Sequence, residues 1–312
     1  MRDRNEEEGN KTLSEREFGI LELLSQCDEP MSQRRIQEGS VYSLATVNRV
    51  LKTLVSKEFV LDGRITAKGL AALEPYRVRR AIFLAAGFGS RLVPMTLNTP
   101  KPLVRVNGTR IIDRLIDACL DIGITEIYVI RGYLAEQFDL LRYKYPMIQF
   151  IDNPRYNETN NIYSVKCVKT LLSNAYVLES DLLISNPKIL KKYHYTSDFL
   201  AIRKDWSDDW CFTVKDGFIT EEKVGGQGKD NYQMVGISCW DEEDGRKLCD
   251  HIEEALRMPG GKEFYWEQVP LVVFKNDYHV KIRECRQEDV TEIDTFRELC
   301  AIDKAYNPGP LG

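Results

Sequence analysis

The stretch Leu84-Ala85-Ala86-Gly87-Phe88-Gly89-Ser90-Arg91, followed by Thr99-Pro100-Lys101-Pro102-Leu103, is the most informative part of this sequence. It overlaps the end of the apolar run Ala81-Ile82-Phe83-Leu84, which predicts a buried strand. A strand that ends in small residues and glycines lets backbone N–H groups come close to a phosphate chain. Arg91 and Lys101 would add fixed positive charge for the same phosphates. We therefore expect a phosphate-binding loop at the end of this strand.

Two common glycine motifs do not describe this loop. A Walker A loop needs G-K-[ST] after its glycines, and the third glycine of the dinucleotide fingerprint G-x-G-x-x-G is missing. An ordinary glycine-rich turn between a strand and a helix is the alternative. The P-K-P motif about ten residues later argues against that alternative, because it supplies a second cation at a fixed spacing.

Size and composition exclude several classes of protein. The chain has 312 residues and a net charge of −5, which argues against a protein that coats nucleic acid or membranes. The charged N-terminus predicts no signal peptide, and we expect no membrane-spanning segment. Eight scattered cysteines without C-x-x-C pairs predict a reduced, cytoplasmic protein. Only three histidines occur, and they are far apart, so a zinc site or a Ser-His-Asp triad is not expected.

The first part of the chain predicts a separate small domain. We expect a disordered tail over residues 1–11, a winged helix-turn-helix over 12–75 and a linker over 76–80. Ser14-Glu15-Arg16-Glu17 forms a capping box, and Ser43 begins a third helix whose inward positions include Val47, Leu54 and Val55. The Asp-Gly pair at 62–63 predicts a tight hairpin. This order of helices and hairpin resembles the winged helix-turn-helix of MarR-like regulators.

DNA binding by this domain is one hypothesis, with the third helix in the major groove. Arg49, Lys52 and Lys57 lie on that helix, and Arg64 lies on the wing. However, residues 1–80 contain 14 basic and 13 acidic side chains, a weak positive charge for a DNA-binding domain. The alternative is a module for packing, dimerisation or regulation.

From residue 81 to 306, apolar runs alternate with amphipathic helical stretches, and residues 307–312 are expected to form a tail. This alternation predicts an α/β fold with an open, mostly parallel sheet and helices on both faces. The strands are expected at 81–85, 126–130, 149–151, 175–179, 199–203, 211–214, 234–240 and 280–284. Ligands of such folds bind beyond the carboxyl ends of the strands, which is where the glycine loop lies.

Two further strand ends are acidic. Tyr176-Val177-Leu178-Glu179-Ser180-Asp181 and Thr291-Glu292-Ile293-Asp294 are strand-like pieces that each end in an aspartate. Asp181 and Asp294 are candidate ligands for Mg²⁺, which binds a few carboxylates together with substrate phosphates. Either residue alone is also typical of a helix N-cap or a surface loop.

Aromatic residues form a third group of candidates. Trp210, Tyr265 and Trp266, with the carboxylate of Glu267, would make a cage for an ammonium group through cation–π attraction. Tryptophans are more often core residues, so this interpretation depends on the other motifs.

The chain resembles the bacterial CTP:phosphocholine cytidylyltransferases over about three quarters of its length. The resemblance is carried by the glycine loop, the two aspartate motifs and the aromatic residues, together with Asn98-Thr99-Pro100-Lys101 and Asn160-Asn161-Ile162-Tyr163-Ser164. The resemblance implies a Rossmann-like nucleotidyltransferase core with a mixed sheet. It places CTP over the loop from Leu84 to Arg91, with Lys101, Gly132, Tyr133, Asn160 and Asn161 also at the nucleotide. It further implies Mg²⁺ on Asp181 and Asp294, and choline among Trp210, Tyr265 and Trp266.

The acceptor and the role of the chain stay open at this point. The domain also resembles cytidylyltransferases that activate 2-aminoethylphosphonate, and phosphoethanolamine is a further alternative. Tyr163, beside the paired asparagines, favours the methylated ammonium of phosphocholine. A sugar-phosphate nucleotidyltransferase and a DNA-binding regulator that senses nucleotides are the rival functions. A homodimer is also left open.

Overall fold

The computed structural model describes residues 12–27 and 29–307. The expected tail at 1–11, and all but residue 307 of the expected tail at 307–312, therefore lie outside the described residues. The chain divides into two compact units, one up to Arg77 and one from Val78 onward. Each unit is described here by itself.

The first unit is a winged helix-turn-helix, as the sequence predicted. Its elements are α1 (Glu15–Ser25), α2 (Gln33–Glu38), α3 (Leu44–Ser56), β1 (Val60–Leu61), β2 (Arg64–Ile65), α4 (Ala67–Leu73) and the 3₁₀ turn η1 (Glu74–Tyr76). Ser14 and Glu17 form the expected capping box at the start of α1. Asp62 and Gly63 have φ angles of 48° and 74°, which is the backbone that a two-residue hairpin requires.

Two details of this unit differ from expectation. Val55 is 51% exposed and does not face the core, because it lies one position beyond the stripe that buries Val47 and Leu54. Tyr76 is buried and packs against Phe18 at a ring-centroid distance of 5.1 Å. The expected linker at 76–80 is therefore shorter, since Tyr76 belongs to the first unit and Arg80 begins β3 of the second.

A nine-stranded mixed sheet forms the centre of the second unit, in the order β10-β14-β12-β11-β13-β8-β3-β6-β7. The strands are β3 (Arg80–Ala85), β6 (Glu126–Arg131), β7 (Gln149–Asp152), β8 (Ala175–Glu179), β10 (Asp198–Arg203), β11 (Trp206–Lys215), β12 (Phe218–Gln227), β13 (Asn231–Trp240) and β14 (Lys281–Cys285). Two short pairs accompany it, β4 (Arg105–Val106) with β5 (Thr109–Arg110), and β9 (Leu182–Ile184) with β15 (Val290–Glu292).

The expectation of a mostly parallel sheet was wrong for one side of it. The strands β8, β3, β6 and β7 are parallel, as are β10 and β14, but β13 runs antiparallel to β8 and β11 runs antiparallel to β12 and β13. β12 was not predicted, because its glutamates, lysine and glycines give it a low strand propensity. The pair Asp216-Gly217 at its start, with φ of 53° and 82°, is a hairpin signal of the same kind as Asp62-Gly63.

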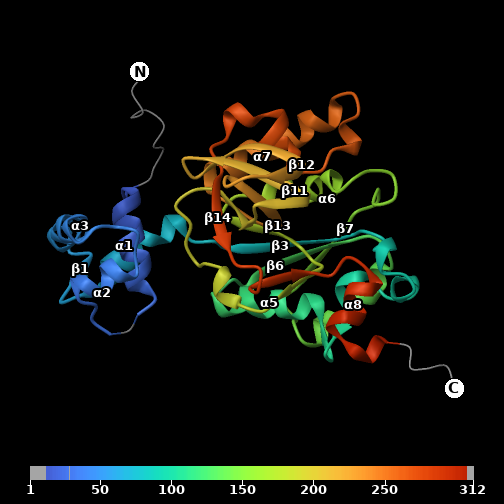
Figure 1. Cartoon of the computed structure of the whole chain (residues 1–312), viewed down its shortest axis with the longest axis horizontal. Coiled ribbons are helices and arrows are strands. Elements are labelled where there is room, and N and C mark those ends of the chain that lie inside the picture. Colours follow the sequence, from blue (N-terminus) through green and yellow to red (C-terminus); the bar gives the residue numbers. More distant parts are fainter. Residues whose placement is uncertain (1–11, 28, 308–312) are drawn as a thin grey trace. The chain divides into compact units, whose positions relative to one another are not determined.

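Helices cover both faces of this sheet, which confirms the predicted fold class (Figure 1). The α-helices are α5 (Ile111–Asp121), α6 (Ile162–Lys166), α7 (Glu242–Arg257) and α8 (Phe296–Ile302). Shorter turns are η2 (Ser90–Leu92), η3 (Met95–Leu97), η4 (Lys101–Leu103), η5 (Ala135–Tyr143), η6 (Lys169–Leu171), η7 (Pro187–Ile189), η8 (Gly261–Glu263), the π-helix η9 (Val269–Val273), η10 (Lys275–Asp277) and η11 (Lys304–Tyr306). Among the residues that the structure describes, no helix combines the length and apolar composition needed to cross a bilayer.

The strand β3 is buried on both sides, which holds its carboxyl end firmly in place. Phe83 faces the core that contains α5, and Ile82 faces the core that contains α6 and α7. Successive side chains of a strand point to opposite faces, so a run of apolar residues fits a strand covered by helices on both sides. The glycine loop begins directly after this strand.

Candidate functional site

The glycine loop borders a cavity of about 240 Å³ at the carboxyl ends of the strands. The loop residues on its wall are Leu84, Ala85, Gly87, Gly89, Ser90 and Arg91, joined there by Lys101, Pro102, Ser180, Asp181 and Asp294. Gly89 has a φ of 61°, and a Cβ on it would lie 2.9 Å from the side chain of Thr96. A Cβ on Gly87 would meet no atom within 4 Å, so this glycine leaves open space in which a ligand can approach the backbone.

Lys101 is the centre of the charge arrangement in this cavity. Its Nζ donates to Oδ2 of Asp181 at 2.7 Å and to Oδ1 of Asp294 at 2.8 Å. Nη2 of Arg91 lies 2.9 Å from the same Asp294 oxygen, while 68% of the Arg91 side chain stays exposed. Burial opposes the charge of Lys101, but the two aspartates outweigh it and raise the pKa of Lys101 above its usual value. The structure thus brings together all four residues that were predicted to be catalytic.

A short strand pair explains how distant segments meet here. β15 pairs with β9 so that Glu292 lies opposite Leu182, directly after Asp181 in the chain. The backbone N–H of Ile293 then donates to the carbonyl of Asp181 at 3.3 Å. Asp294 follows at once and therefore reaches the same cavity.

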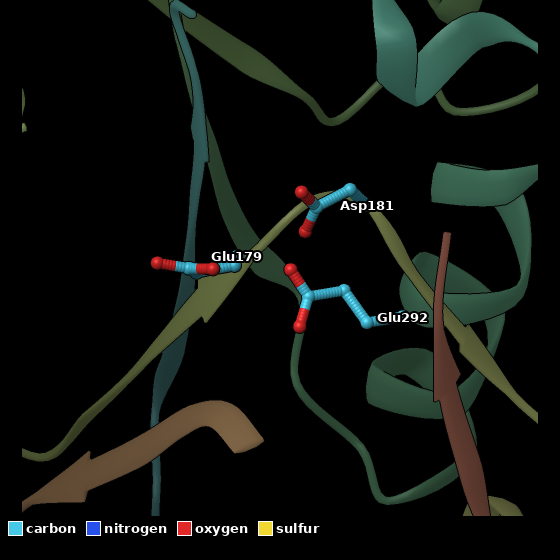
Figure 2. Close-up of side chains that lie close together, drawn as sticks. All are labelled: Glu179, Asp181 and Glu292. Carbon is cyan, nitrogen blue, oxygen red and sulfur yellow. The ribbon is translucent and has the colours of Figure 1, made fainter. Parts of the chain in front are cut away.

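Three carboxylates near this point form a candidate metal centre. Glu179, Asp181 and Glu292 each offer an oxygen atom, and these atoms lie within 4.8 Å of one another. Figure 2 shows the carboxylates of Asp181 and Glu292 facing each other, with Glu179 beside them at the end of β8. Oδ1 of Asp181 is buried and has no hydrogen-bond partner in the described part of the chain. An all-oxygen set with such an unpaired atom fits a hard divalent cation.

The protonation of these acids reflects their crowding. Burial, and then the charge of Asp181, raises the pKa of Glu292 to about 9. The same two causes raise the pKa of Glu179 well above its usual value. A bound cation would favour the ionised carboxylates, since it supplies the positive charge that the cluster lacks.

A second cavity of about 250 Å³ shares Gly87 and Asp181 with the first. Asn160 and Asn161 are on its wall, as predicted for the nucleotide site. The N–H of Asn160 donates to the carbonyl of Lys262 at 2.8 Å, and Oδ1 of Asn161 accepts from the N–H of Trp266 at 2.8 Å. The asparagines therefore also hold the 260s segment in place.

Gly132 and Tyr133 contact the glycine loop from β6. The N–H of Tyr133 donates to the carbonyl of Ala86 at 3.1 Å, and its hydroxyl donates to the carbonyl of Thr96 at 2.9 Å. A Cβ on Gly132 would lie 2.6 Å from the side chain of Tyr156, so only glycine allows this close approach. In this structure both residues support the backbone of the loop.

The structure brings together fewer aromatic rings than the predicted cage contained. Trp210 and Tyr265 meet edge to face, with ring centroids 5.3 Å apart. Trp266 is 3% exposed and packs against Phe199 and Trp240 in the core. The apolar surroundings of its large ring explain why this tryptophan is a core residue.

Tyr163 lies on the wall of a different cavity, of about 630 Å³. Its ring already faces two cations, Arg155 at 5.5 Å and Lys166 at 4.8 Å from the centroid. The structure therefore does not bring Tyr163 to the pair of Trp210 and Tyr265. The preference for phosphocholine that relied on Tyr163 loses this support.

Three further acidic residues were not predicted: Glu179 and Glu292 of the metal cluster, and Glu222 on β12. A signal for the first two was present, because each lies two residues before a predicted aspartate, in Glu179-Ser180-Asp181 and Glu292-Ile293-Asp294. Glu222 lies on the unpredicted strand β12, so no motif pointed to it.

Comparison with known proteins gives two matching families. Residues 80–203 match the model of the nucleotidyl transferases, and residues 15–61 match that of the IclR helix-turn-helix domain. The second match agrees with the predicted winged helix-turn-helix, although its family is IclR and not the MarR-like group that the sequence resembled.

Individual relatives agree with the first match. A 2-aminoethylphosphonate cytidylyltransferase of Lancefieldella rimae is 33% identical over 72% of this chain and 92% of its own length. A choline-phosphate cytidylyltransferase of Streptococcus pneumoniae is 32% identical over 72% of this chain and 97% of its own length. The solved structure of CTP:phosphocholine cytidylyltransferase from Streptococcus pneumoniae has a TM-score of 0.67 and 31% identity, covering 74% of this chain and all of that chain.

Proposed function

This chain belongs to the nucleotidyltransferase family and is an enzyme, and we propose that it transfers CMP from CTP to a small acceptor with an anionic and a cationic end. The acceptor candidates are phosphocholine, 2-aminoethylphosphonate and phosphoethanolamine. The observation that carries this proposal is the single cavity where the glycine loop meets Lys101, Asp181 and Asp294. Its relatives named after 2-aminoethylphosphonate and choline-phosphate support the choice of CTP and of these acceptors.

The proposed step is an in-line displacement at the α-phosphorus of CTP. An oxygen of the acceptor's phosphate or phosphonate forms the new P–O bond, the bond between the α-phosphorus and its bridging oxygen breaks, and pyrophosphate leaves with the electron pair. The attacking oxygen is already ionised at neutral pH, so the step needs no general base. Catalysis then consists of positioning and charge stabilisation.

The residues of the cavity have distinct roles in this proposal. The backbone of the loop around Gly87 and Gly89 holds the triphosphate, and Arg91 neutralises the leaving pyrophosphate. Lys101 stabilises the charge that grows on the α-phosphate. Asp181 would hold Mg²⁺ together with Glu179 and Glu292 or with Asp294, and the bound ion supplies positive charge to the phosphates. Trp210 and Tyr265 receive the cationic end of the acceptor.

All eight cysteines are free thiols, which agrees with the cytoplasmic location that we propose.

Release of pyrophosphate tests the proposal directly. CTP and Mg²⁺ should give turnover with at least one of the three acceptors, and UTP should give much less. EDTA should abolish the turnover, and excess Mg²⁺ should restore it. Turnover with hexose 1-phosphates alone would contradict the proposal and favour a sugar-phosphate nucleotidyltransferase.

We also propose that the first unit binds double-stranded DNA. The match of residues 15–61 to the IclR helix-turn-helix domain supports this, and Arg49 and Lys52 are exposed on α3. The affinity for a 30-base-pair duplex should fall as salt is raised, and the double variant R49A/K52A should reduce both the affinity and the salt slope. Absence of binding at low salt to duplexes taken from around its own gene would contradict this second function.

A further inference from the structure

Two acidic residues with buried carboxylate oxygens take no part in the steps above. They are Glu222 on β12 and Glu267, two residues after Tyr265. Glu267 is only 3% exposed, and its Oε2 atom has no hydrogen-bond partner within residues 12–27 and 29–307. Both carboxylate oxygens of Glu222 are likewise buried and have no partner among the residues that the structure describes. A buried acceptor without a donor is costly, so these three unpaired oxygens require an explanation.

The strand register places Glu222 on the same face of the sheet as Trp210. Phe212 lies opposite Glu222 in the pairing of β11 with β12, and Trp210 lies opposite Val224, the next pair on the same face. The neighbouring Glu221 points to the other face, where it is exposed and pairs with Lys223 at 2.7 Å. Glu222 and Trp210 therefore face the same region.

Glu267 reaches that region from a second element. The ring of Phe212, which lies opposite Glu222, packs against Phe199 with ring centroids 5.3 Å apart. Phe199 in turn stacks on Trp266 with centroids 6.0 Å apart, and Glu267 directly follows Trp266 in the chain. The charge of Glu222 also contributes, after burial, to raising the pKa of Glu267. Asn161 donates a hydrogen bond to Glu267, but that bond satisfies only one of its oxygens.

We propose that Glu222 is a specificity-determining residue, which with Glu267 receives a primary ammonium group of the acceptor. This inference rests on the proposed function and narrows its acceptor to an aminoalkyl phosphonate or phosphate. A primary ammonium carries three N–H donors, and the two carboxylates offer three unpaired oxygens. A trimethylammonium group has no N–H, so it would bury the same oxygens without giving them a hydrogen bond. Trp210 and Tyr265 attract either cation and therefore do not discriminate between them.

The test compares acceptors that differ only in N-methylation. One pair is 2-aminoethylphosphonate and its trimethylammonio analogue, and the other is phosphoethanolamine and phosphocholine. The value of kcat/KM is measured for each with CTP and Mg²⁺, in the unchanged protein, in Glu222→Gln and in Glu221→Gln. Glu221 is the matched control, because it is the adjacent glutamate on the exposed face.

We expect the unchanged protein to prefer the primary amine at least tenfold in whichever pair it turns over. Glu222→Gln should lower kcat/KM for the primary amine roughly 10- to 100-fold, mainly through KM, and change the methylated acceptor less than threefold. Glu221→Gln should leave both values unchanged. A preference for the methylated acceptor, or an equal loss for both acceptors in Glu222→Gln, overturns the inference while the proposed function stands. No turnover with any of the four acceptors overturns the proposed function, and the inference with it.

Discussion

The two ends of the proposed acceptor site treat buried charge in opposite ways. At the phosphate end, Asp181 and Asp294 already share the ammonium group of Lys101, and Arg91 adds a second contact to Asp294. At the ammonium end, neither oxygen of Glu222 has a partner within the described residues. At the first end the chain itself supplies cations to Asp294 and to one oxygen of Asp181, whereas the carboxylate of Glu222 at the second end depends on what binds there.

This difference indicates which end sets the rate and which sets the choice of acceptor. Charges that are paired before the substrate arrives need little reorganisation during the reaction, which is the basis of electrostatic catalysis. Charges that lack a partner discriminate among ligands, because only a ligand with the right donors satisfies them. Changes at the phosphate end should therefore reduce kcat, and changes at the ammonium end should alter KM and selectivity.

Asp181→Asn should have the largest effect. It removes one carboxylate charge from the metal cluster and one partner of Lys101, while the amide keeps the size of the side chain. We expect kcat to fall at least ~100-fold with little change in the thermal midpoint. Asp121→Asn, an exposed aspartate at the end of α5, is the control. Turnover close to that of the control would remove Asp181 from the reaction.

Lys101→Met should come next. The methionine keeps most of the buried stem but leaves Asp181 and Asp294 without the cation between them. We expect kcat to fall by roughly 10- to 100-fold. We also expect KM for ethylphosphonate, the analogue of 2-aminoethylphosphonate without the ammonium group, to change in the same direction as KM for the acceptor itself. Lys144→Met, which removes a half-exposed surface lysine paired with Asp117, is the control. If KM changed only for the acceptor that carries an ammonium group, Lys101 would lie at the ammonium end of the site, which would contradict its assigned role.

Trp210→Ala should act on binding instead of on the rate. Loss of one aromatic face costs about 0.5–2 kcal/mol, which raises KM for the acceptor roughly 2- to 30-fold while kcat stays nearly constant. Trp206→Ala is a close control, since Trp206 lies on the same strand and is 65% exposed. Equal KM values in the two variants would exclude Trp210 from the acceptor site.

Glu222→Gln should also change the free energy of unfolding, by an amount that depends on pH. Burial raises the pKa of Glu222 to about 7 in the folded protein. A carboxyl whose pKa is raised on folding contributes stability below its unfolded pKa, near 4.5, and loses that contribution as pH rises toward 7. Above pH 7 the unchanged protein therefore buries a charge that the glutamine variant lacks.

We expect Glu222→Gln to be the more stable protein at pH 8 by roughly 1–3 kcal/mol and equally stable at pH 4.5. Urea unfolding of the ligand-free proteins at the two pH values measures this difference. A variant that is less stable at both pH values would mean that Glu222 has a structural partner, and the contrast between the two ends would then fail.

The sequence predicted much of the phosphate end because that end consists of strand termini. Gly87, Gly89 and Asp181 each follow an apolar run, and parallel strands bring such positions to one edge of a sheet. The position of these motifs at the ends of strands was therefore enough to group Lys101 with Asp181. The acids Glu179 and Glu292 were present in the same two motifs, but each was assigned to its strand and not to the site.

The ammonium end was only partly predictable, because it is made of side chains that strand registers and ring packing bring together. The sequence pointed to Trp210 and Tyr265, but it also grouped Trp266 and Tyr163 with them. The fold instead places Trp266 in the core and Tyr163 beside Arg155 and Lys166. Glu222 lies on a strand whose composition gives a weak signal, so nothing in its local sequence marked it.

By itself, the amino-acid sequence determined the two units and the phosphate loop, because these depend on local motifs and on apolar periodicity. The class of enzyme followed from the resemblance of those motifs to a known family. Only the tertiary structure decided which acids face a metal ion, which aromatic rings stay available to a ligand and which carboxylates lack a partner. The physical reason is that burial and pairing depend on neighbours that are distant in sequence. An unpaired charge exists only once the fold has excluded water from it without providing a donor.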